Sequence, residues 1–265
     1  MKRFSEIGAF ILVLVVILSA IVTIIISGNR TTDTHYVCIE LNPRIEFLAD
    51  KEQNVKSYKP LNQEAKALIS EEEFIGLKIT DACDKFLTLC ARAGYLKVDG
   101  NNNAIKISVL SGFNQGLESN LIKTTNGFLV KNNILGIVIE SSHDLAQYKS
   151  AKKYGVSSEK YDLMLAVREN NSTLPLENLK KYSCVELVKK IEDSHKKYDA
   201  TTTQEDIDHK QELLNVYEPI YLNHIENITN ESTRSFKEKL KIFKAENTKQ
   251  YKINFEQKYN EWLFG

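Results

Sequence analysis

The hydrophobic pattern begins with one uninterrupted apolar run. Residues 9–26 read AFILVLVVILSAIVTIII, with no charged residue, proline or glycine. A helix of this length spans about 27 Å, close to the ~30 Å hydrocarbon thickness of a bilayer. Lys2 and Arg3 precede the run. The positive-inside rule therefore predicts a cytoplasmic tail over residues 1–8 and a transmembrane helix over residues 9–27.

A cleaved signal peptide is the competing interpretation of this run. Its apolar part would be about 7–15 residues long and followed by a small-x-small cleavage site. The run found here is longer, and Ser-Gly-Asn-Arg follows it. We therefore expect an uncleaved, single-pass protein of the cell membrane, with its N-terminus in the cytoplasm and everything from Ser27 onward outside.

After a short polar tether the pattern changes to a period of two. Apolar and polar residues alternate over residues 35–49 (HYVCIELNPRIEFLA), which predicts one half-buried strand. Residues 50–53 resemble a hairpin turn and residues 54–59 a returning strand. Shorter apolar runs at 104–110 and 136–140 predict two further strands.

Helical spacing of apolar residues fills the gaps between these strands. It predicts a short helix over 60–70, a clearer one over 80–93 that ends at Gly94, and a third over 116–131. The order is strand, strand, helix, helix, strand, helix, strand. That order favours an α+β fold for residues 35–142, with helices on one face of a small, mostly antiparallel sheet.

The rest of the chain is helical in pattern. Amphipathic segments at 144–153, 157–168 and 183–195 predict a helical extension over residues 143–198. Apolar residues then recur at helical spacing over residues 203–264, which predicts an all-helical C-terminal region.

Charge divides this last region into two halves. Seven acidic residues and one basic residue lie between Thr203 and Ser232, whereas eight basic and four acidic residues lie between Thr233 and Glu261. Opposite charges on consecutive helices favour an antiparallel pair. We therefore predict a helical hairpin, with two separately solvated amphipathic helices as the alternative.

Composition excludes one class of function and leaves cysteine pairing open. Thirty-five Lys and Arg residues balance 35 Asp and Glu residues, which argues against a nucleic-acid binder. A hydrophobic content of 42% is enough for a packed core. The cysteines lack zinc-site spacing and are expected to be mostly buried free thiols, although a Cys38–Cys90 or Cys83–Cys184 bridge stays open. The four cysteines are Cys38, Cys83, Cys90 and Cys184.

The chain contains no familiar enzyme motif. It has no phosphate loop, Gly-rich dinucleotide turn, H-E-x-x-H or G-x-S-x-G sequence. Its histidines are not at metal-ligand spacing and are expected on the surface. We therefore expect no metal, no cofactor and no turnover enzyme; an envelope enzyme with a scattered active site is the alternative. The five histidines are His35, His143, His195, His209 and His224.

The dipeptide Asn42-Pro43 is the one chemically suggestive feature. A proline within the predicted strand removes a ladder donor, and it makes the preceding peptide a tertiary amide that twists more easily than others. The Asn42 side-chain amide can attack its own carbonyl, close a succinimide and expel the Pro43 nitrogen. Strain at this point would favour such self-cleavage. An edge-strand proline without chemistry is the alternative.

The residues around this dipeptide resemble a known family. Residues 37–69 read VCIELNPRIEFLADKEQNVKSYKPLNQEAKALI, and residues 74–96 read FIGLKITDACDKFLTLCARAGYL. The aliphatic-Asn-Pro-x-Ile-Glu strand, the Leu-Asn before a helix and the Gly-Tyr-Leu cap resemble the extracytoplasmic domain of RsgI-type anti-sigma factors of Gram-positive bacteria. Residues 152–191 are similar to the same family, so the resemblance extends over about 37–195.

The resemblance implies a SEA-like α/β domain on the outer side of one membrane helix. It also implies autoproteolysis at an Asn-Pro bond, which corresponds here to Asn42 and Pro43. In the family, the two fragments stay associated through the sheet until a signal separates them. Intramembrane proteolysis then releases a cytoplasmic anti-sigma domain.

The sequence departs from the family pattern ahead of the membrane helix. Too few residues precede residue 9 to fold an anti-sigma module, so we do not expect this chain to bind a sigma factor directly. The partners expected instead are the membrane and an envelope protein or membrane protease. A non-cleaving, membrane-tethered interaction or structural protein of the envelope is the alternative.

Overall fold

A computed structural model describes most of the chain after residue 33. The predicted tail and membrane helix lie outside the described residues. Within those residues, no helix is both long and apolar enough to cross a bilayer. The described residues are 34–100, 103–110, 115–140, 145–198, 200–228 and 230–264.

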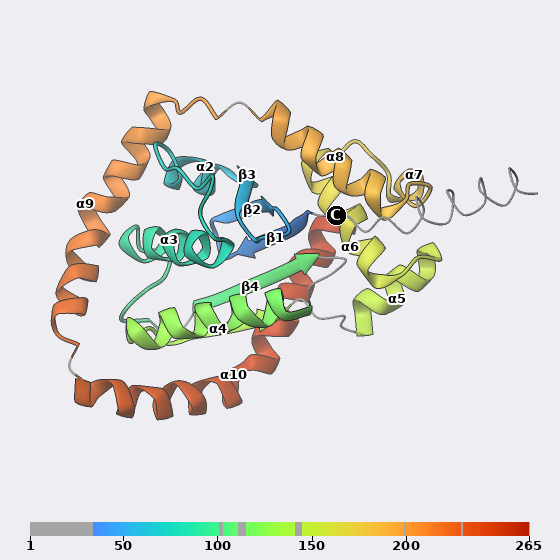
Figure 1. Ribbon diagram of the computed structural model, residues 1–265. Coiled ribbons are helices and arrows are strands. Elements are labelled where there is room, and N and C mark those ends of the chain that lie inside the picture. Colours follow the sequence, from blue (N-terminus) through green and yellow to red (C-terminus); the bar gives the residue numbers. More distant parts are fainter. Residues whose placement is uncertain are drawn as a thin grey trace, which may run out of the picture. The chain divides into compact units, whose positions relative to one another are not determined.

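The described strands form a single five-stranded sheet in the order β3-β2-β1-β4-β5 (Figure 1). β1 therefore occupies the centre and pairs antiparallel with both β2 and β4. β2 and β3 are also antiparallel, whereas β4 and β5 are parallel. The predicted α+β fold with a mostly antiparallel sheet is confirmed. The strands are β1 (His35–Glu40), β2 (Arg44–Ala49), β3 (Val55–Pro60), β4 (Asn103–Leu110) and β5 (Gly136–Glu140).

The single strand predicted over 35–49 is wrong, because these residues form a hairpin. β1 and β2 pair with Ile39 opposite Ile45 and Glu40 opposite Arg44. In this register odd-numbered residues face odd-numbered residues. The period of two therefore passes unbroken through the turn at 41–43, and alternation alone cannot tell one long strand from this hairpin.

The helices lie close to their predicted positions, and the C-terminal region is helical as predicted. A short additional helix, α7, was not predicted. The helices are α2 (Gln63–Leu68), α3 (Ile79–Arg92), α4 (Gln115–Lys131), α5 (Leu145–Tyr154), α6 (Ser158–Asn170), α7 (Leu176–Leu179), α8 (Cys184–Lys197), α9 (Gln204–Glu226) and α10 (Asn230–Phe264).

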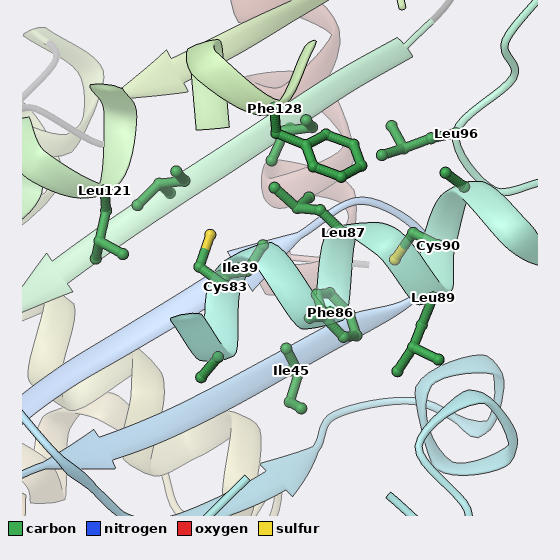
Figure 2. Close-up of a cluster of buried hydrophobic side chains, with 14 of the residues drawn as sticks. Ile39, Ile45, Cys83, Phe86, Leu87, Leu89, Cys90, Leu96, Leu121 and Phe128 are labelled. Atoms are coloured by element: carbon green, nitrogen blue, oxygen red, sulfur yellow. The ribbon is translucent and has the colours of Figure 1, made fainter. Parts of the chain in front are cut away.

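The larger core lies on one face of the sheet. Odd-numbered side chains of β1 and β2 point to this face, and α3 and α4 cover them. Figure 2 shows Ile39 and Ile45 of the strands together with Phe86 of α3 and Phe128 of α4 in this layer. Burying one large apolar side chain stabilises a fold by about 1.5–3 kcal/mol, so this layer contributes strongly to stability.

A second core lies on the opposite face of the sheet. The helices of residues 35–142 lie on the first face, as predicted, and the second face is covered by helices that follow them in the chain. Tyr36, Cys38 and Leu48, at even-numbered positions of β1 and β2, pack with residues of α6 and α8. Met164 of α6 and Leu187 of α8 are completely buried there. The predicted helical extension therefore supplies the layer that covers the second face.

The predicted hairpin of α9 and α10 is also wrong. α9 packs on α2 and α3, whereas α10 packs on α4 and β5. Tyr221 of α9 and Leu240 of α10 both join the larger core. The acidic side of α9 meets basic residues of the domain instead of those of α10. Two ion pairs of these acidic residues are Lys66–Asp206 at 3.0 Å and Arg92–Glu218 at 2.6 Å.

The cysteines are free thiols, as the sequence favoured. Cys38, Cys83 and Cys90 are buried, and Cys184 is exposed. Burial raises the pKa of the Cys83 thiol to about 12, and hydrogen bonding to Thr125 only partly opposes that change. The buried thiols therefore stay protonated near neutral pH and pack as small apolar groups.

Gly94 fixes how α9 docks on the domain. It follows α3 with a φ of +77°, a conformation that favours glycine. The ring of Tyr217 on α9 lies against it: a Cβ atom at position 94 would lie 2.4 Å from the Tyr217 Cγ. This position therefore requires glycine for two reasons, its backbone angle and the close approach of α9.

Replacement of Gly94 separates these two reasons. Gly155 has a similar φ of +69° but open space around it. We expect Gly155→Ala to lower the free energy of unfolding by about 1–2 kcal/mol through backbone strain. Gly94→Ala should cost about 1–3 kcal/mol more, because the Tyr217 ring must move. Chemical denaturation measures both values.

Gly127 provides the control for these two variants. It lies inside α4, with no atom near the position of an added Cβ. Gly127→Ala should be neutral or stabilising by up to about 1 kcal/mol, because alanine favours a helix. Equal losses of unfolding free energy in Gly94→Ala and Gly155→Ala would contradict close packing of α9 against Gly94.

Candidate functional site

The predicted site residues lie in the turn that joins β1 to β2. Asn42 is exposed and Pro43 is buried. The Leu41 N–H donates to the Pro43 carbonyl at 3.0 Å and closes the turn. The mid-strand position expected for Asn42 and Pro43 is therefore wrong. Since Pro43 lies in the turn, its missing N–H removes no ladder hydrogen bond.

One side chain from outside the turn holds it in place. Asn62, the N-cap residue of α2, donates from Nδ2 to Asn42 Oδ1 at 3.0 Å. Its own Oδ1 accepts from the backbone N–H of Arg44 at 3.1 Å and of Ala65 at 3.1 Å. Asn62 therefore contacts the chain on both sides of the Asn42–Pro43 bond while it caps α2.

The backbone adds one more bond between these segments. The Leu61 N–H donates to the Arg44 carbonyl at 2.9 Å. The turn is consequently tied to the end of β3 and the start of α2. The hydrogen bond from Asn62 is made to the oxygen of the Asn42 side-chain amide. The amide nitrogen, which is the atom that would attack in succinimide formation, takes no part in that bond.

Charged residues gather beside the turn, on the face covered by α6 and α8. Arg44 forms an ion pair with Glu169 of α6 and lies 3.8 Å from Glu40. Glu40 Oε1 also pairs with Lys106 Nζ of β4 at 3.4 Å. The cluster therefore links both strands of the hairpin to β4 and α6.

The carboxyl groups of this cluster have different pKa shifts. Burial raises the pKa of Glu169 to about 7; Arg44 opposes this change, whereas Glu40 and Glu46 add to it. Burial would also raise the pKa of Glu40, but Lys106 and Arg44 outweigh it and the pKa falls. Glu169 is consequently the group of this cluster that titrates near neutral pH.

A second polar cluster surrounds Glu46, which is completely buried. Its carboxylate accepts from the Tyr36 hydroxyl at 2.9 Å and lies 2.8 Å from His195 Nε2. His195 Nδ1 lies 2.9 Å from the Ser57 hydroxyl. Asn170 Nδ2 donates to the same carboxylate at 3.2 Å. These bonds tie α6 and α8 to the sheet.

Sequence reasoning missed this second cluster. His195 and His35 are buried, so their predicted surface positions are wrong. His209 is exposed as predicted, and His224 is half-buried with Nε2 2.8 Å from the Asn132 carbonyl oxygen. His143 lies outside the described residues. One feature of the sequence pointed to these clusters. Polar residues recur at even-numbered positions of the hairpin, on the side that also carries Cys38 and Leu48.

No group of three or more His, Cys, Asp or Glu side chains is arranged to hold a metal ion in the part of the chain that the structure describes.

The sequence of this domain matches a known family description, the anti-sigma factor RsgI-like central domain, over residues 34–166. The match covers half of the chain and extends from β1 into α6. The chain belongs to this family. The RsgI-like central domain thus includes the Asn42–Pro43 turn, Asn62 and the complete sheet, and the resemblance inferred from the sequence is confirmed. α9 and α10 lie beyond the matched residues.

Three related proteins are anti-sigma-I factors of Acetivibrio thermocellus. RsgI7 is 26% identical over 165 residues, which cover 61% of this chain and 30% of the relative. RsgI6 is 23% identical over 210 residues, which cover 72% of this chain and 27% of the relative. RsgI3 is 25% identical over 118 residues, which cover 44% of this chain and 18% of the relative. The matched part spans less than a third of each relative.

The raised pKa of Glu169 predicts a pH dependence of stability. An ordinary Glu has a pKa of about 4.3, so between there and about 7 the folded state keeps a proton that the unfolded state has released. The stability from this group is full below the lower pKa and is lost as pH rises through the higher one. Glu169→Gln should flatten the fall in unfolding free energy between pH 5 and 7.

An exposed carboxyl serves as the control for Glu169. Glu177 pairs with Lys180 on the surface, and its side chain is 63% exposed. Glu177→Gln should leave the pH dependence of chemical denaturation as it is in the wild type. A wild-type slope in Glu169→Gln would contradict the assignment to Glu169.

Proposed function

We propose that this chain is a membrane-anchored regulatory protein with an extracytoplasmic RsgI-like domain that cleaves itself at Asn42–Pro43. The observation that carries the proposal is the position of this bond. It lies in the turn directly after β1, and β1 is the central strand of the sheet. A cut there would leave the central strand on the membrane-anchored fragment and the rest of the sheet on the other.

The proposed reaction needs only atoms of the turn. Asn42 Nδ2 attacks the main-chain carbonyl carbon of Asn42, and a new N–C bond forms. The bond from that carbon to the Pro43 nitrogen breaks, and a proton from Nδ2 passes to the Pro43 nitrogen. The products are a C-terminal succinimide and an N-terminal proline. Water later opens the succinimide. Asn42 is exposed, which allows this water to reach it.

The sheet explains why the fragments would stay together. β1 pairs with β2 over six residues and with β4 over five. Its side chains Val37 and Ile39 are completely buried. Each hydrogen bond adds about 0.5–1.5 kcal/mol and each cross-strand pair about 0.2–1 kcal/mol. The sum over two ladders and two cores supports a stable non-covalent complex.

Such a complex supports a signalling role. Force or ligand binding that extracts β1 would open the sheet at its centre and expose both cores at once. An envelope protein could supply the pull, and a membrane protease could then act on the anchored fragment. The relatives are named anti-sigma-I factors, which supports a role in the same class of regulation.

A non-cleaving interaction protein of the envelope is the second candidate. It is favoured by apolar side chains that α9 presents to solvent. Val216, Ile220 and Leu222 are each about half exposed. Such residues on one helix suit a protein partner. In this case the Asn42–Pro43 bond would stay intact.

The integrity of this bond decides between the candidates. We expect intact mass spectrometry of the full-length protein in detergent to find one fragment that ends at Asn42 and one that begins at Pro43. Before hydrolysis the first fragment should be one water lighter than a free acid, because the succinimide retains no water. Both fragments should elute together in native gel filtration and separate in denaturant.

Two variants of Asn42 are the controls. Asn42→Ala removes the attacking nitrogen and should give one uncut mass. Asn42→Gln keeps the amide but must close a larger ring, so it should be cut much more slowly. A single uncut mass for the wild type would refute self-cleavage and favour the interaction protein.

A further inference from the structure

Asn62 holds both sides of the candidate bond through one side chain. Its Nδ2 donates to Asn42 Oδ1 at 3.0 Å, on the side of the attacking amide. Its Oδ1 accepts from the Arg44 N–H at 3.1 Å, on the side of the departing segment. Asn62 caps α2, twenty residues along the chain from Asn42, whereas Asn42 and Arg44 flank Pro43.

We propose that Asn62 is a positioning residue for self-cleavage, a proposal that rests on the proposed function above. The bond to Asn42 Oδ1 fixes the rotation of an exposed amide that would otherwise sample many orientations. Holding a nucleophile near its target removes much of the entropic barrier of a reaction. The same bond draws electron density toward Oδ1, which makes the Nδ2 protons easier to lose during attack.

The Arg44 contact positions the other partner of the reaction. It fixes the peptide that follows Pro43, so the leaving nitrogen is held against a rigid segment. Because Arg44 is also bound to Glu169 of α6, this segment has support from two sides. Asn62 therefore joins the nucleophile and the leaving group into one fixed arrangement.

Asn62 also caps α2, and the experiment must separate the two roles. Asn62→Asp keeps an oxygen that can accept from Arg44 and Ala65, so the helix cap is retained. It loses the donor to Asn42. Asn62→Ser also caps helices well, but its side chain is shorter and does not span to Asn42 and Arg44. Both variants therefore test positioning in a capped helix.

The measurement follows cleavage from the start. Full-length protein is made by cell-free synthesis in lipid nanodiscs, and samples taken over time are quenched in denaturant for intact mass analysis. We expect Asn62→Asp and Asn62→Ser to cleave at least tenfold more slowly than the wild type at pH 7. Their melting temperatures should remain close to that of the wild type.

A cap far from the turn provides the matched control. Ser157 caps α6 by accepting from the Lys160 N–H. Ser157→Ala should lower the melting temperature and leave the cleavage rate unchanged. This result would separate loss of a helix cap from loss of positioning.

The pH profile gives a readout that a purely structural role would not move. A protonated carboxyl at position 62 can donate a hydrogen bond again, and an ordinary Asp has a pKa of about 3.9. The rate of Asn62→Asp relative to the wild type should therefore rise as pH falls from 7 toward 4. Asn62→Ser lacks a titrating group and should show a constant ratio.

Three outcomes would overturn the inference. A wild-type cleavage rate in folded Asn62→Asp and Asn62→Ser would exclude positioning by Asn62 while self-cleavage stands. Slow cleavage in Ser157→Ala, equal to that of the Asn62 variants, would assign the effect to stability alone. An uncut wild-type chain would refute the proposed function, and this inference would fall with it.

Discussion

The structure depends on the pairing of β1 with strands on both of its edges. As the central strand, β1 shares one ladder with β2 and another with β4. Its alternating side chains also reach two different cores: Val37 and Ile39 lie in the layer under α3, and Tyr36 and Cys38 lie under α6 and α8. Few strands of a small sheet join so many parts. Removal of β1 would therefore break two ladders and open two cores.

The second face of the hairpin imposes a different constraint, because it buries charge. Arg44, Glu40 and Lys106 share one cluster, and Glu46 forms another with His195. Removing one partner of a buried pair leaves an uncompensated charge, which costs about 3–5 kcal/mol. These directional bonds join Glu169 and Asn170 of α6 and His195 of α8 to the hairpin. Both faces bury apolar side chains, and the second face adds these polar and charged contacts to its apolar core.

The structure differs from the predictions made from the sequence at three points. Alternation over 35–49 identified extended chain but not the turn, because the hairpin register preserves parity. Amphipathic helices at 144–195 were found at nearly their true positions, yet nothing in their pattern assigned them to the second face. Complementary charge suggested that α9 and α10 pair with each other. The acidic residues of α9 instead meet Lys66 and Arg92, since charge is satisfied by any basic partner within reach.

The pattern of residues along the chain predicted the kind and approximate position of most of the described strands and helices, and it indicated the Asn42-Pro43 dipeptide and the family. These features depend on neighbours along the chain: side-chain periodicity, caps and turn residues. Tertiary structure alone decided that Asn42 lies in a turn, that Asn62 binds it from twenty residues away, and that Glu46 and His195 meet across 149 positions. Such contacts join residues distant in the chain. They are set by how the layers pack, which no local pattern encodes.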